Sequence, residues 1–182
     1  MGLDVSAYRK LKQLDVLFNA DGDPVNPATG EELEYDDYVK PYISRDFPKQ
    51  AADLVKGAAY GFEDSAHVWS GGYGGYNNWR EELAKLAGYP VGVYYRVPGY
   101  APSATESYSQ GAFQVASGPF HELICFSDCE GAIGPTVCAK LAKDFAEWDE
   151  RAKAVGGWFY ESYVMWREGF EFAADGGAIE FH

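Results

Sequence analysis

The sequence lacks most features that mark secreted, membrane or nucleic-acid-binding proteins. It has three cysteines in 182 residues, an odd number with no paired CxxC spacing, so neither a disulfide framework nor a zinc motif is indicated. It has no apolar run of about 18 residues, which a membrane-spanning helix needs, and its first residues do not form a signal peptide. Basic residues number 15 against 28 acidic ones, and the net charge of −13 disfavours binding to nucleic acid or anionic membranes. We therefore expect a cytoplasmic protein whose Cys125, Cys129 and Cys138 stay reduced.

The residues that are abundant indicate a well-packed globular protein. Hydrophobic residues make up 47% of the chain and aromatic residues 16%, which is enough to bury a core without covalent cross-links. We predict a single domain over residues 1–182. Its expected class is α+β, with a mainly antiparallel sheet packed against about three helices.

Three segments have helical spacing. The first is expected to begin at Asn77 or Asn78 as N-cap and to end at Gly88. The second begins near Pro135 and ends before residues 156–157. In the third, the aromatic residues from 159 to 170 recur at intervals of three and four, which is typical of one buried helix face.

Other segments have the composition of strands and loops. Predicted strands cover residues 14–18, 59–69, 91–97, 113–115 and 120–126, the last two as a hairpin, and residues 178–182 as a short edge strand. Residues 98–111 are expected to form a loop, and residues 23–56 a long irregular excursion.

A short acidic turn follows the first predicted strand. Asn19, Asp21 and Asp23 resemble the start of a calcium-binding loop, but Pro24 stands where such a loop needs glycine. The alternative is a turn stabilised by the Asn19 side chain.

Four motifs along the chain resemble a group of uncharacterised phage and prophage proteins. They are GLD at residues 2–4, GGYNNWREELA at residues 74–84, FSDCEGAIGP at residues 126–135 and a terminal FH at residues 181–182. The resemblance implies a phage accessory protein that acts in the cytoplasm of a bacterial host. It implies no activity.

The first candidate site is the glycine-rich segment before the first predicted helix. Glycines allow a ligand to approach the backbone, and a helix N-terminus attracts anions. Side chains that could stack on a flat ring or hold a phosphate are Trp69, Tyr73, Tyr76, Trp79 and Arg80. The alternative is that these aromatic residues fold back to cap the core.

The second candidate site lies between the predicted hairpin and the second helix. Asp128 or Glu130 could act as a general base or bind a cationic group, with Ser127 beside them. Alternatively, Ser127 and Asp128 only stabilise a turn. On a strand, His121 and Cys125 would share one face as a weak candidate for a metal site or a thiol nucleophile.

These observations leave three hypotheses about function. The first is a non-enzymatic protein that sequesters a small nucleotide-like host molecule, such as an immune second messenger, on behalf of a phage. The second is an acidic decoy or inhibitor of a host protein, suggested by the charge. The third is a hydrolase that uses Asp128 or Glu130. We predict no cofactor and no metal, and we expect a homo-oligomer, because pockets of small ligand-binding proteins often form between subunits.

Overall fold

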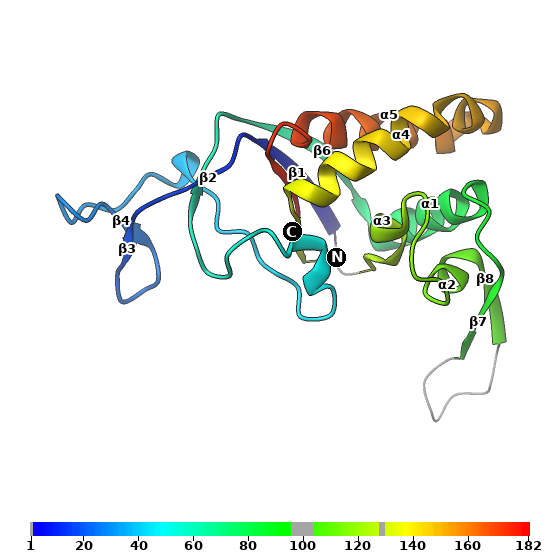
Figure 1. Ribbon diagram of the computed structural model, residues 1–182, viewed down its shortest axis with the longest axis horizontal. Helices are drawn as coiled ribbons and strands as arrows, with labels where there is room; N and C mark the ends of the chain where they lie inside the picture. Colours follow the sequence, from blue (N-terminus) through cyan, green and yellow to red (C-terminus); the bar gives the residue numbers. More distant parts are fainter. Residues whose placement is uncertain (1, 96–103, 128–129) are drawn as a thin grey trace.

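A computed structural model describes residues 2–95, 104–127 and 130–182 (Figure 1). Its α-helices are α1 Tyr73–Leu86, α2 Tyr108–Ala112, α3 His121–Cys125, α4 Pro135–Val155 and α5 Gly157–Ala173. Its strands are β1 Gly2–Arg9, β2 Lys12–Gln13, β3 Leu17–Phe18, β4 Pro24–Val25, β5 Tyr60–Gly61, β6 Asp64–Gly72, β7 Gly92–Tyr95, β8 Ala104–Ser107, β9 Gly131–Ile133 and β10 Ala178–Phe181. Two short 3-10 helices are η1 Tyr35–Asp37 and η2 Pro48–Ala51. This α+β class was predicted, although the described residues contain five α-helices rather than about three.

A four-stranded antiparallel sheet in the order β6-β1-β10-β9 organises the molecule. The prediction of an edge strand at residues 178–182 was wrong in its position, because β10 lies between β1 and β9. Strand β1 had not been predicted at all, although it pairs with β6 and β10 on its two sides. The sheet therefore joins the first and last described segments of the chain.

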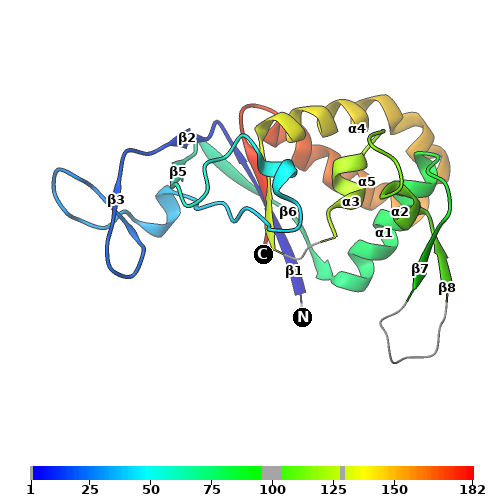
Figure 2. The same ribbon diagram turned by 60° about the horizontal axis from the view of Figure 1, so that its bottom comes forward.

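The two faces of the sheet are covered differently (Figures 1 and 2). On one face, Leu3, Val5 and Ala7 alternate out of β1 and pack into the main core with α1, α4 and α5. Helices α4 and α5 agree with two of the predicted helices, and Gly156 separates them with a positive φ of 70°. The other face carries Tyr8 and Glu180, and part of it is covered by the segment that includes η2 and a smaller apolar cluster.

The predicted hairpin at residues 113–115 and 120–126 is wrong. Residues 121–125 form α3, and residues 108–112 form α2, of which 108–111 were predicted as part of a loop. Tertiary contacts hold α3: the backbone N–H of Phe120 donates to Asp144 of α4 at 2.6 Å, and Phe120 itself has a left-handed φ of 56°. Contacts with a residue more than twenty positions away leave no trace in a local hydrophobic pattern.

A narrow arm built from β2 to β4 and η1 extends away from the sheet (Figure 1). Only Leu17 and Phe18 of the predicted strand at residues 14–18 are in a strand, and both are exposed. The turn that follows is held by the Asn19 side chain, whose Oδ1 accepts the backbone N–H groups of Asp21 and Asp23. This confirms the alternative of an Asn-stabilised turn.

The β7–β8 hairpin is attached to α1 through one carboxylate. Glu81 accepts hydrogen bonds from the backbone N–H groups of Tyr108 and Ser109 and from the hydroxyls of Ser107 and Ser109, at 2.6 to 3.0 Å. Burial alone would raise the pKa of Glu81, but these hydrogen bonds together lower it. A charged Glu81 thus fixes the start of α2 against the first helix.

Candidate functional sites

The predicted glycine-rich loop at residues 70–78 is not a loop. Strand β6 continues to Gly72, and α1 begins at the next residue, so that its N-cap is Gly72 rather than the predicted Asn77 or Asn78. The ring of Trp69 lies over Gly71, where a Cβ atom would be 2.7 Å from it. At Gly71 the missing side chain makes room for an indole ring of the core rather than for a ligand.

The aromatic residues of this segment lie in the core. Tyr76 and Trp79 are each 1% exposed and Trp69 is 8% exposed. The Trp79 ring stacks on Trp166 of α5 with centroids 5.2 Å apart, and the Tyr76 hydroxyl donates to the Phe126 carbonyl at 2.8 Å. Their surfaces are therefore already covered by the protein, as the core-cap alternative predicted.

Arg80 is also buried, at 5% exposure. Its guanidinium donates to the Ile124 carbonyl and to the Asn77 Oδ1, each at 3.0 Å, and lies over the Tyr76 ring. It ties α1 to the C-terminal end of α3, so it is a structural cation rather than an open anion receptor. Tyr73, the remaining predicted residue of this group, is half-buried against the core.

The second predicted site falls partly outside the described residues. Asp128 and Cys129 are not among them, whereas Ser127 and Glu130 are exposed between α3 and β9. Residues 42–47 run beside this connection: the Ala132 N–H donates to the Tyr42 carbonyl at 2.8 Å, and the rings of Phe47 and Phe126 are 5.3 Å apart. The second predicted site therefore adjoins a segment whose structure the sequence did not predict.

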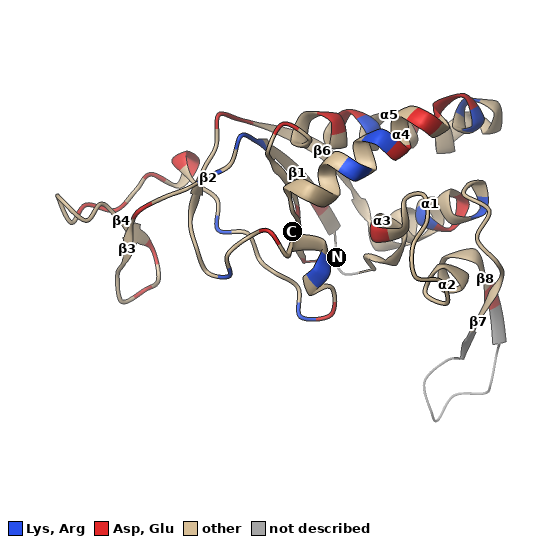
Figure 3. Ribbon diagram, in the orientation of Figure 1, with Lys and Arg blue, Asp and Glu red and all other residues tan. Residues whose placement is uncertain are grey.

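That segment forms one wall of a pocket of about 680 Å³, the Arg45 pocket, which is defined by Arg45, Lys49, Phe113, His121, Glu122 and Cys125. Arg45 and Lys49 are exposed, and neither forms an ion pair with another described residue. Glu122, by contrast, is neutralised by Lys140. Figure 3 shows the basic positions on and before η2, in a molecule whose arm and long helices carry many acidic ones. The pocket is thus lined by two exposed cations that form no ion pair with a described residue, together with one exposed acid, Asp46.

The apolar part of this pocket includes an exposed aromatic ring. Phe113 follows α2 and is 47% exposed, and Phe47, the N-cap of η2, lines the same pocket. An aromatic side chain at the edge of a pocket offers a face on which a flat ring can stack. Sequence analysis missed Phe113 because it assigned that residue to a buried hairpin.

His121 and Cys125 meet in this pocket through helical rather than strand spacing. The Cys125 Sγ lies 3.6 Å from the His121 Nε2, and the same nitrogen is within 3.1 Å of the carbonyl oxygens of Ala112 and Val115. Because carbonyl oxygens only accept, Nε2 carries the proton and is not free to take one from the thiol. Burial also raises the pKa of Cys125 to about 11. The pair is therefore not an activated thiol nucleophile.

A second polar group lies on the outer face of the sheet. The Ser70 hydroxyl donates to the Asp4 carboxylate at 2.5 Å and lies 3.0 Å from the His67 Nε2. In a hydrolytic triad the carboxylate orients the imidazole, whereas here it binds the serine itself. Within the described part of the chain, no three His, Cys, Asp or Glu side chains are grouped to hold a metal.

Comparison with models of known protein families, with curated proteins and with solved structures gives no significant match in any of the three. In the described residues, no helix is long and apolar enough to span a membrane. The geometry of the pockets is thus the main structural indication of function.

Proposed function

We propose that the protein is a non-catalytic receptor that holds a small nucleotide-like molecule in the Arg45 pocket. The observation that carries this proposal is that Arg45 and Lys49, which form no ion pair with a described residue, line the same pocket as the exposed ring of Phe113. Cations hold phosphate oxygens, with Arg able to do so through two parallel hydrogen bonds, and an aromatic ring stacks on a base. The pocket volume lies in the range of small-molecule sites, which is about 300 to 1,000 Å³.

The overall charge supports the choice of this pocket for an anion. With a net charge of −13, most of the surface repels a phosphate-bearing ligand. An anion is therefore directed to the few places where a positive side chain is not already neutralised. Lys140, which does not line the pocket, forms ion pairs with both Glu122 and Asp144 and contributes no free charge.

Sequestration fits the pocket better than turnover. The thiol of Cys125 is protonated at neutral pH, and the His121 nitrogen facing it is already a donor. The sequence motifs that resemble phage proteins extend the proposal to the identity of the ligand. On that basis the ligand would be an immune second messenger in the cytoplasm of a bacterial host. Self-association of the chain remains a prediction of the same kind.

The acidic decoy stays as a second candidate because of the arm. Its residues Leu17 and Phe18 are 60% and 43% exposed, and Figure 3 shows acidic positions along it. Exposed apolar side chains ringed by charge are typical of protein-binding surfaces. The hydrolase that would use Asp128 and Glu130 is supported by no contact among the described residues.

A thermal-shift screen with nucleotides, cyclic dinucleotides and ADP-ribose derivatives tests the proposal. A ligand present at about 100 times its Kd adds about 2.7 kcal/mol, which corresponds to a rise in Tm of about 5 to 10 °C. Because Arg45→Glu should weaken binding by about tenfold or more, it should reduce the added stability to about 1.4 kcal/mol or less. Lys85→Glu reverses a similarly exposed charge on α1, outside the pocket, and should preserve it. The absence of a shift with every compound would sink the proposal, and chromatography of the mixture would reveal turnover.

A further inference from the structure

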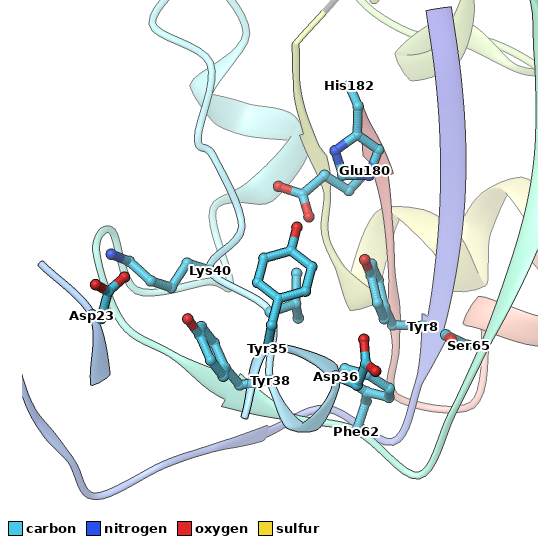
Figure 4. Close-up of a pocket in the computed structure, with 11 residues that line it drawn as sticks. Tyr8, Asp23, Tyr35, Asp36, Tyr38, Lys40, Phe62, Ser65, Glu180 and His182 are labelled. Carbon is cyan, nitrogen blue, oxygen red and sulfur yellow. The ribbon is translucent and has the colours of Figure 1, made fainter. Parts of the chain in front are cut away.

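A second pocket lies where the arm meets the outer face of the sheet (Figure 4). It has a volume of about 570 Å³ and is called here the Tyr35 pocket, defined by Tyr8, Tyr35, Asp36, Tyr38, Phe62 and Glu180. It shares no lining residue with the Arg45 pocket. The Tyr35 pocket is therefore a ligand site distinct from the Arg45 pocket.

The innermost charged group of this pocket is the Glu180 carboxylate. Glu180 is in the central strand β10, is only 7% exposed, and receives one hydrogen bond, from the Tyr42 N–H to Oε1 at 3.1 Å. No Lys or Arg of the described chain forms an ion pair with it. Burial raises its pKa, against the smaller opposing effects of the Tyr42 hydrogen bond and of His182. A desolvated carboxylate in this position gains stability from a cation.

Aromatic rings form the walls around this carboxylate. Tyr8 and Phe62 pack with centroids 5.0 Å apart, and Tyr35 and Tyr38 meet edge to face at 6.3 Å. Figure 4 shows the Tyr35 hydroxyl directed toward Glu180, with the Tyr35 ring between the rings of Tyr38 and Tyr8 in this view. Faces of aromatic rings attract cations, and phenol oxygens accept hydrogen bonds from ammonium groups.

The remaining charges make the pocket selective for positive ligands. Asp23 and Asp36 line it together with Glu180, and in Figure 4 tyrosine rings stand between these acids. The one lysine, Lys40, points away from Glu180, donates to the Gly22 carbonyl at 2.5 Å, and lies over the Phe18 ring. His182 also lines the pocket. Lys40 is thus already engaged, whereas none of the three carboxylates forms an ion pair with a described residue.

We propose that the Tyr35 pocket binds a linear organic amine with two or more positive charges. One ammonium group pairs with Glu180, the methylene chain lies along the tyrosine rings, and a second ammonium group pairs with Asp36 or Asp23. Carboxylates separated by aromatic faces match this alternation of charge and alkyl chain.

Isothermal titration of the full chain with putrescine, spermidine and butylamine at physiological salt tests this inference. Because that salt screens interactions beyond about 8 Å, general attraction to an acidic surface is reduced. The diamine should bind about tenfold or more tightly than butylamine, which has a single charge. Equal affinity for the two would overturn the assignment of a second ammonium site.

Two substitutions locate the site. Glu180→Gln keeps an oxygen that can accept the Tyr42 N–H, and should weaken putrescine binding by about tenfold or more. Asp36→Asn, on the exposed η1, tests the second contact without touching the core. Glu147→Gln removes an exposed carboxylate of α4, outside the pocket, and should leave affinity within about twofold. If Glu180→Gln and Asp36→Asn both bind like the parent, or if Glu147→Gln weakens binding as much as they do, the proposal is wrong.

Discussion

The segment from Trp69 to Arg80 and the Tyr35 pocket contain the same kinds of side chain in opposite situations. In the first, aromatic rings and a charged group are buried against one another, and the guanidinium of Arg80 is hydrogen-bonded inside the protein. In the second, tyrosine rings and a buried carboxylate face an open volume. Residue type alone does not separate a core from a ligand site. What separates them is whether the protein itself already covers and pairs these groups.

The largest expected effect concerns the covered region. Trp79→Ala should lower the free energy of unfolding by about 3 to 5 kcal/mol, because it leaves a cavity between α1 and α5. Urea denaturation measures this loss. Trp158→Ala, at a position that is 51% exposed, is the matched control and should cost less than about 1 kcal/mol. Similar losses for the two variants would break the contrast between buried and open aromatic residues.

Arg80→Ala should come next, with a loss of about 2 to 3 kcal/mol. It removes a charged donor from the buried Ile124 carbonyl and leaves that oxygen without its partner. Urea denaturation measures the free energy of unfolding of Arg80→Ala and of Lys85→Ala. Because Lys85 is an exposed residue of the same helix, the difference between the two losses isolates the effect of burial. Two variants of equal stability would mean that Arg80 is a surface cation after all.

Glu81→Gln tests, through the pH dependence of stability, whether the hydrogen-bonded carboxylate of Glu81 is charged in the folded protein. The hydrogen bonds on Glu81 outweigh its burial and lower its pKa, so its charge stabilises the fold above the pKa of an unfolded glutamate, about 4.3. That contribution is lost as the pH falls through the lowered pKa of the folded state. Thermal melts should show the variant about 1 to 2 kcal/mol less stable at pH 7, and this difference should shrink as the pH falls below the unfolded pKa and through the lowered one. A gap that does not depend on pH would contradict this account.

Glu180→Gln should have the smallest effect and the opposite sign. Burial raises the pKa of Glu180, so the folded state holds that proton more tightly than the unfolded state does. The parent therefore loses stability as the pH rises from the unfolded pKa through the raised one. In the absence of amine, the variant should have a higher Tm than the parent at pH 7 and the same Tm as the parent at acidic pH. A lower Tm at pH 7 would show that a partner already neutralises Glu180.

The sequence was sufficient for the parts of the fold that depend on local pattern. Helices α4 and α5 have apolar residues at helical spacing, and both were predicted. It was not sufficient for α3, whose start is held by Asp144, or for β1, whose alternation of Leu3, Val5 and Ala7 is short and follows no turn signal. In these places contacts between distant segments decide the structure.

The candidate sites were harder to predict than the fold. Glycines beside aromatic residues suggested an open loop, but whether an indole ring or a ligand fills the space over Gly71 depends on tertiary packing. Arg45 and Lys49 lie in the stretch whose structure was predicted as irregular. The signal available in the sequence was their positive charge in an acidic chain. That charge indicates a site only once the structure shows that neither residue forms an ion pair with a described residue.

The most direct test of the account is one titration, carried out below the Tm of every variant. The parent, Arg45→Glu and Trp79→Phe are compared for binding of the nucleotide that gives the largest thermal shift. We predict that Trp79→Phe is less stable than the parent but binds within about twofold of it, since a core residue does not touch the ligand. Arg45→Glu should keep the Tm of the parent and bind about tenfold or more weakly. Weakened binding by Trp79→Phe together with unchanged binding by Arg45→Glu would contradict the account and return the ligand to the segment between Trp69 and Arg80.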